Sequence, residues 1–155
     1  MLGQNGTRPV VLAVSSGGGH WVQMQRLAPA FSGADVHFAT TDATAIERVR
    51  SSNLHVYPDA NKDTPLRLIL CVLRLSWIVF WLRPDVVVST GAAGGFLAIR
   101  LARLIGARTM FIDSIANARE LSISARLSLG VADRVLSQWP GVAALTGAEY
   151  RGAVI

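Results

Sequence analysis

The feature of this sequence that most constrains its fold is the alternation of short β-branched runs with longer segments of helical pattern. This alternation is typical of successive βα units, whose strands form a parallel sheet covered by helices. Six runs have the composition of strands: 9–15, 35–40, 54–57, 85–90, 108–113 and 134–138. Helices are expected at 20–30, 43–51, 65–82, 94–105 and 120–130. The sequence therefore predicts an α/β fold with a doubly wound, Rossmann-like parallel sheet.

Length and composition indicate one globular domain over residues 1–155. The chain is 51% hydrophobic and 16% charged, so it can bury a substantial core. The net charge is +5, and fourteen of the fifteen basic residues are arginines. Such a balance is compatible with nucleic acid, an anionic membrane or phosphorylated substrates. Because the arginines are scattered and are not interleaved with aromatic residues, we do not expect a nucleic-acid partner.

The cysteine content and the N-terminal residues indicate the cellular compartment in which the protein is expected. Cys71 is the single cysteine, so the sequence holds neither a disulfide framework nor a metal knuckle. Residues 1–8 are too short and polar for a signal peptide. We therefore expect the chain to lie in a reducing cytoplasm.

Two predicted strands, the first and the fourth, end in glycine-rich turns: SSGGGH at 15–20 and STGAAGG at 89–95. In the commonest doubly wound order, 3-2-1-4-5-6, these strands are neighbours, and ligands bind at their carboxyl ends where the winding reverses. The two turns are therefore expected to face each other across one crevice.

Such turns favour phosphate, because glycine lets a ligand approach main-chain N–H groups and the following helix start adds unpaired donors. The alternative is that the glycines only make tight strand-to-helix turns. The candidate phosphate-binding residues, which the resemblance described below implies meet a diphosphate, are Ser16, Gly17, Gly18, Gly19, Thr90, Gly91, Gly94 and Gly95.

Two common phosphate motifs do not fit. A nucleotide-hydrolysing P-loop needs Gly-Lys-Ser/Thr, and Lys62, the single lysine, is far from both turns. A dinucleotide fingerprint would place its third glycine at Val22. Asp42, at the end of the second strand, keeps a weak version of the dinucleotide interpretation open.

His20 follows the first turn, at the start of the predicted helix. A neutral imidazole there can accept a proton from an attacking hydroxyl, a role worth about 10²- to 10⁴-fold in rate. Alternatively, His20 only caps the helix or hydrogen-bonds the ligand. His37 and His55 lie in or beside strands without ligand spacing and are expected to be structural.

Asp113 and Ser114 end the fifth predicted strand, on the same edge of the sheet, and NARE (117–120) follows them. A carboxylate at this position can orient a sugar or a base. It can equally cap the next helix, because Ser, Asp and Asn favour that position.

The stretch 66–82 is strongly apolar but carries two arginines, and it is marginal for a transmembrane span. Arg67 and Arg74 fall on one helical face, and Trp77 and Trp81 fall on one stripe. This pattern suits a helix lying in a bilayer interface, so no span is predicted and these four residues are the candidate membrane contacts. The alternative is a helix packed on the sheet with one exposed side.

Together with SGGGH, the segment 112–140, which ends in QWP, makes the chain resemble the Alg-fourteen-type oligosaccharide biosynthesis proteins, including the PssD-type subunits of exopolysaccharide and capsule glycosyltransferases. That family is similar to the N-terminal half of two-domain GT-B glycosyltransferases, which holds a polyprenyl-diphosphate-linked acceptor. The resemblance implies that a separate partner supplies the UDP-sugar-binding half. Eukaryotic members often begin with a transmembrane anchor, and none precedes the first strand here.

The resemblance also implies roles for particular residues. Gly17 to His20 match the family's first glycine loop, with His20 the proposed base, and Gly91, Gly94 and Gly95 match the second loop. Arg119 and Glu120 fall where family members carry charged residues, so Glu120 joins His20 as a catalytic candidate and Arg119 joins Asp113 and Ser114 as an acceptor-orienting candidate. No metal or cofactor is implied, because main-chain N–H groups and arginines can carry the phosphate charge.

The resulting hypothesis is an inverting glycosyltransferase subunit at the cytoplasmic face of the inner membrane, with little activity without its partner. Two alternatives stay open. One is a scaffold that recruits an enzyme to the membrane without touching substrate, and the other is a dinucleotide-binding oxidoreductase domain.

Overall fold

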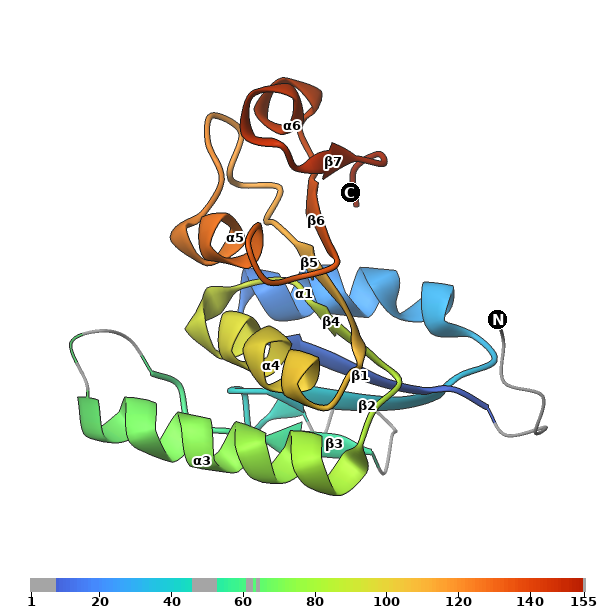
Figure 1. Cartoon of the computed structure of the whole chain (residues 1–155), viewed down its shortest axis with the longest axis vertical. Helices are drawn as coiled ribbons and strands as arrows, with labels where there is room; N and C mark the ends of the chain where they lie inside the picture. Colours follow the sequence, from blue (N-terminus) through green and yellow to red (C-terminus); the bar gives the residue numbers. More distant parts are fainter. Residues whose placement is uncertain (1–7, 46–52, 61–62, 64, 155) are drawn as a thin grey trace.

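A single parallel sheet organises the molecule (Figure 1). The computed structural model describes residues 8–45, 53–60, 63 and 65–154. The strands of this described part are β1 (Val10–Ser15), β2 (Asp35–Thr40), β3 (Leu54–Val56), β4 (Val86–Ser89), β5 (Arg108–Ile112), β6 (Arg134–Ser137) and β7 (Glu149–Tyr150). They lie in the order β3-β2-β1-β4-β5-β6-β7, and all pairs are parallel. The doubly wound order predicted for the first six strands is confirmed.

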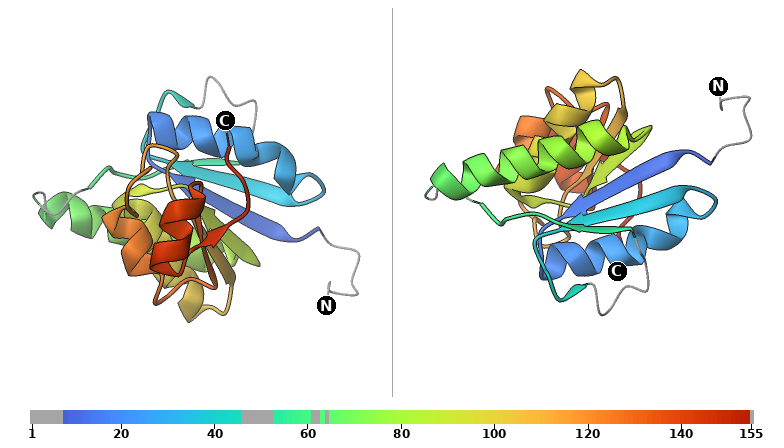
Figure 2. Two further views of the ribbon diagram at one scale, coloured as in Figure 1. Left: turned by 90° about the horizontal axis from the view of Figure 1, so that it is seen from above. Right: turned by 90° about the horizontal axis from the view of Figure 1, so that it is seen from below.

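Helices cover both faces of the sheet. They are α1 (Gly19–Leu27), the 3₁₀ helix η1 (Ala28–Phe31), α3 (Pro65–Leu82), α4 (Ala92–Leu104), α5 (Ile123–Ser128) and α6 (Pro140–Thr146). Figure 2 shows α1 on one side of the sheet and α3 and α4 on the other. The helix expected at 43–51 lies largely outside the described residues. The short elements α6 and β7 were not predicted, and the helix expected at 120–130 is only the shorter α5.

The centre of the sheet is buried on both faces, which is why its strands read as continuous apolar runs. In β1, Leu12 and Val14 belong to the larger core under α3, α4 and α5, whereas Ala13 faces Trp21 and Met24 of α1. Because β1 pairs in parallel with β2 on one side and β4 on the other, the segments that follow these three strands lie at the same edge of the sheet.

The long helix α3 has clear chemical boundaries. It begins at Pro65, where the missing N–H costs nothing in the first turn. It ends before Arg83, whose φ of 48° leaves the right-handed region, and Pro84, which disfavours helix in the residue before it. These signals lie in the sequence, and the bounds of α3 match the predicted 65–82.

Candidate functional site at the carboxyl ends of β1 and β4

The two glycine-rich turns meet, as the strand order predicts. The Nδ1 atom of His20 donates to the carbonyl oxygen of Thr90 at 2.8 Å. In return the Thr90 hydroxyl donates to the carbonyl oxygen of His20, also at 2.8 Å. Gly91 lies so close to the imidazole that a Cβ at this position would overlap the ring. His20 and Thr90, which lie 70 positions apart in the chain, are therefore in direct contact.

The N-termini of two helices lie beside the contact between His20 and Thr90. Helix α1 starts after Gly18 (φ 67°) and α4 starts after Gly91 (φ 144°), and neither N-cap residue supplies a side-chain hydrogen bond to its helix. The first N–H groups of an α-helix have no partner within the helix, and the helix dipole adds about half a positive charge there. The surface between the first turns of α1 and α4, called the crevice below, is therefore suited to an anion.

Not every amide of the turns is available to a ligand. The Gly17 N–H donates to the Thr41 hydroxyl at 2.9 Å, and the Gly91 N–H donates to the Ser89 hydroxyl at 3.2 Å. The hydroxyl of Ser16 makes a long contact of 3.5 Å with the Gly17 carbonyl. The amides left for an anion are thus those of the first turns of α1 and α4.

The hydrogen bond to Thr90 sets the chemistry of His20. A carbonyl oxygen only accepts, so Nδ1 carries the proton and the neutral ring keeps its lone pair on Nε2. The His20 side chain is half-buried at the start of α1. A neutral ring held in this orientation presents Nε2 as a proton acceptor, and the role of His20 as a base stays a prediction.

The buried residue Asp113 organises the loop after β5. Its carboxylate accepts from the Ser122 N–H and from the Asn117 amide, each at 2.9 Å. Its carbonyl accepts from the side-chain amides of Gln138 at 2.9 Å and Gln23 at 3.4 Å. Asp113 therefore ties α1, the 113–122 loop and the end of β6 together, and the carboxylate holds the loop in shape.

The other residues predicted after β5 lie nearer solvent. Ser114 closes a turn, since its hydroxyl accepts from the Ala116 N–H at 3.2 Å. Glu120 is exposed and pairs with Arg126 at 3.0 Å, and Arg119 is exposed beside it. The ion pair of Glu120 does not bring its carboxylate to His20, so its catalytic role stays a prediction.

The remaining glycines of the second turn pack inside the protein. Gly94 and Gly95 lie in the first turn of α4 and are buried. A Cβ on Gly94 would meet the ring of Tyr57, and one on Gly95 would overlap the Ser89 hydroxyl. Close packing of α4 on the sheet accounts for both glycines, and their contact with a diphosphate stays a prediction.

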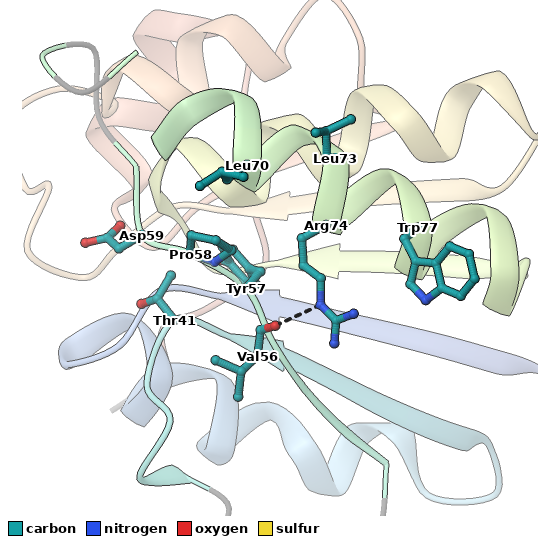
Figure 3. A pocket seen from close by; sticks show the side chains of 9 residues that line it. All are labelled: Thr41, Val56, Tyr57, Pro58, Asp59, Leu70, Leu73, Arg74 and Trp77. Atoms are coloured by element: carbon teal, nitrogen blue, oxygen red, sulfur yellow. Dashed lines mark hydrogen bonds between the residues drawn. The ribbon is translucent and has the colours of Figure 1, made fainter. Parts of the chain in front are cut away.

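A groove that sequence reasoning missed adjoins the crevice (Figure 3). It has a volume of about 720 Å³ and lies between α3 and the segment that follows β3. Its lining residues are Thr41, Val56, Tyr57, Pro58, Asp59, Leu70, Leu73, Arg74 and Trp77. The apolar VYP run at the end of the third strand was the available signal, but only the tertiary structure sets it against α3.

Helix α3 presents a broad apolar face to solvent. Trp77 is 63% exposed and Trp81 is 64% exposed. Arg67 is exposed on the same helix, and Arg74 donates from Nε to the Val56 carbonyl at 3.2 Å. Within the described residues, α3 is the one helix whose length and composition would allow it to cross a membrane, and 22% of it is buried. Core helices of soluble proteins can share this length and composition, so these two properties alone are weak evidence of a span.

Burial disfavours ionisation of two side chains near the groove, Cys71 and Tyr57. Burial raises the pKa of the Cys71 thiol to about 11, with a further contribution from Asp59. Burial also raises the pKa of Tyr57, whose hydroxyl donates to the Ser15 carbonyl at 2.9 Å. The described part of the chain holds no group of three or more His, Cys, Asp or Glu side chains that could bind a metal ion.

The arrangement of strands and helices is that of a known class of domain. A seven-stranded parallel sheet with flanking helices matches the N-terminal Rossmann-like domains of GT-B proteins. No protein-family model matches the sequence, and a search of curated proteins finds no match.

Solved structures similar to this chain include Acinetobacter baumannii MurG, with a TM-score of 0.73 and 17% identity over 94% of this chain and 45% of that chain. The UDP-N-acetylglucosamine 2-epimerase of Rickettsia bellii gives 0.69 and 12% over 92% and 43%. Staphylococcus aureus MnaA, solved with UDP, gives 0.69 and 10% over 92% and 43%. At these identities the similarity shows the fold, and the chain spans less than half of each neighbour.

Proposed function

We propose that this chain is the acceptor-binding component of a two-component inverting glycosyltransferase acting at the cytoplasmic face of the membrane. Its acceptor is a sugar linked to a polyprenyl diphosphate, as in polysaccharide or lipid-linked oligosaccharide biosynthesis. The observation that carries the proposal is the reciprocal bonding of His20 and Thr90, which brings two uncapped helix N-termini to one crevice.

The acceptor diphosphate binds between the first turns of α1 and α4. Main-chain N–H groups and two helix dipoles stabilise its charge there, and the Ser16 hydroxyl lies beside them. The proposal assigns no metal or cofactor, because these donors supply the charge compensation that a cation would otherwise provide.

His20 acts as the general base. The acceptor hydroxyl attacks the anomeric carbon of a UDP-sugar, and the bond from that carbon to the UDP oxygen breaks as the new bond forms. The hydroxyl proton passes to Nε2 of His20, while the electron pair of the broken bond leaves on UDP. Attack opposite the leaving group inverts the anomeric configuration. The bond from Nδ1 to Thr90 holds the ring in the required tautomer.

A partner protein provides the UDP-sugar site. The chain matches 45% of the MurG chain and 43% of the MnaA chain solved with UDP, which supports a UDP-sugar site outside these 155 residues. Helix α3 contacts the membrane through its exposed indoles, with Arg67 and Arg74 near the phosphate headgroups.

The proposal is tested in the complex reconstituted with its donor-binding partner. His20→Ala should lower kcat by about 10²- to 10⁴-fold. His20→Asn is the informative companion, because its amide can still donate to the Thr90 carbonyl while the base is lost. Both variants should assemble normally, and both should lose turnover.

Other outcomes separate the alternatives. If both His20 variants turn over normally in the intact assembly, the chain is a scaffold and the proposed mechanism is wrong. Calorimetry with NAD and with inorganic pyrophosphate addresses the oxidoreductase alternative, since the proposal requires binding of pyrophosphate and predicts none of NAD.

A further inference from the structure

Two residues that line the groove beside α3 also contact the glycine turns. Thr41 lines the groove, and its hydroxyl accepts from the Gly17 N–H in the first glycine turn. Tyr57 lines it as well, and its ring packs against Gly94 at the start of α4. One ligand can therefore occupy the crevice with its head and the groove with its tail.

The lining of the groove is mostly apolar. Leu70, Leu73 and Trp77 come from α3, and the facing wall is formed by the segment around Pro58 (Figure 3). Arg74 is held against this wall by its bond to the Val56 carbonyl. The volume of about 720 Å³ lies within the range of small-molecule sites, roughly 300–1,000 Å³.

The far end of the groove reaches the exposed face of α3. Trp77 belongs both to the groove and to a shallow hollow that it forms with Phe80 and Trp81. An apolar chain leaving the crevice through the groove would thus emerge where α3 is proposed to meet lipid.

We propose that this groove binds the isoprenoid chain of the acceptor, in the units next to the diphosphate. The inference rests on the proposed function and deepens it, because it assigns the tail of the lipid to a defined concavity rather than to the bilayer. The groove shields those units from water while the head lies at the two helix N-termini.

Two neighbouring side chains allow a matched test. Leu70 lines the groove and is 48% exposed, whereas Ile69 is 56% exposed and is not part of the groove lining. Both lie on α3 and both already face water, so Leu70→Ser and Ile69→Ser should leave the fold intact. Equal unfolding midpoints would verify this.

The experiment measures binding of farnesyl diphosphate and isopentenyl diphosphate to the full chain by calorimetry, without vesicles. The wild type should bind the farnesyl compound roughly tenfold or more tightly, because its longer chain buries more apolar surface. Leu70→Ser should weaken farnesyl diphosphate binding more than isopentenyl diphosphate binding and reduce the preference to within about threefold, whereas Ile69→Ser should keep the preference.

The contrary outcomes are distinct. Equal binding of the two compounds by the wild type, or equal losses in both variants, would overturn the groove assignment and leave the proposed diphosphate site standing. If neither compound nor inorganic pyrophosphate binds, the groove assignment and the proposed diphosphate site fail together. Farnesol binding as tightly as farnesyl diphosphate would overturn the proposed diphosphate site, since the head would then contribute nothing, and would leave the groove assignment standing.

Discussion

His20 and Thr90 hold each other by two hydrogen bonds of 2.8 Å, one from the imidazole Nδ1 to the Thr90 carbonyl and one from the Thr90 hydroxyl to the His20 carbonyl. The pair joins the first turn of α1, on one face of the sheet, to the residue that follows β4. Because each residue both donates and accepts, neither turn can shift without breaking a bond of the other. The geometry of the proposed anion site depends on this pair.

Replacement of Thr90 by valine should destabilise the protein by about 1–2 kcal/mol. Thr90 is fully buried, so removing its hydroxyl leaves the His20 carbonyl without that donor. Urea unfolding of Thr90→Val measures the loss, and Thr90→Ser, which keeps the hydroxyl, is the control. Equal stability of Thr90→Val and the wild type would show that the hydroxyl bond contributes nothing to joining the turns.

Gly91→Ala should be strongly harmful. A Cβ would overlap the His20 ring, and φ at this position is 144°, a conformation that L side chains rarely adopt. We expect a loss of about 1–3 kcal/mol in unfolding free energy and a displaced imidazole. Gly19→Ala is a matched control for stability, because its Cβ would have open space at the start of α1. If the two variants unfold at the same denaturant concentration, the close approach of Gly91 to His20 is wrong.

The strand order and the meeting of the two turns could be predicted because they follow from local signals. Apolar runs mark the strands, glycines mark the turns, and the usual doubly wound order places them side by side. The ends of α3 were predictable for the same reason, since Pro65 and the Arg83–Pro84 pair are local terminators.

Other features depend on tertiary partners. Helix α5 starts at Ile123, where the Ser122 hydroxyl caps it by accepting from the Ala125 N–H. The Asp113 carboxylate holds the preceding loop through the Ser122 N–H, and the sequence does not show this second contact. The sequence pattern predicts that Gly94 belongs to a phosphate-binding loop, but in the structure Tyr57 packs directly against it. The groove could not be predicted either, because its two walls come from segments that touch only in the folded chain.

Trp77→Ser combined with Trp81→Ser should lower co-sedimentation with anionic phospholipid vesicles by about tenfold or more. Each indole is more than 60% exposed, and burying an aromatic side chain in the interface is worth on the order of 1–3 kcal/mol. Leu145→Ser is the control, because Leu145 is 86% exposed on α6, away from α3. Unchanged sedimentation of the double variant would contradict membrane contact through α3.

Acid should destabilise the protein through His55. Its ring stacks on His37 with centroids 5.3 Å apart, and the two rings share one hydrogen bond of 3.0 Å. Burial lowers the pKa of His55 below its ordinary value of 6.5, and the charges of His37 and Arg74 lower it further. The unfolded chain therefore binds the proton more readily than the folded chain does. Stability falls as pH drops from about 6.5 toward the folded pKa, below which the penalty is complete.

His55→Gln should remove this component of the acid sensitivity. The measurement is the urea midpoint of wild type and variant at about pH 7.5 and at about pH 5, and the wild type should lose more stability between the two. His55 also lines a hollow with Arg74, Trp77 and Trp81, so its protonation places a second cation beside Arg74 under the exposed face of α3. An equal loss of stability in both proteins would assign the acid sensitivity to other groups and would leave the His37–His55 contact without an energetic role in this pH range.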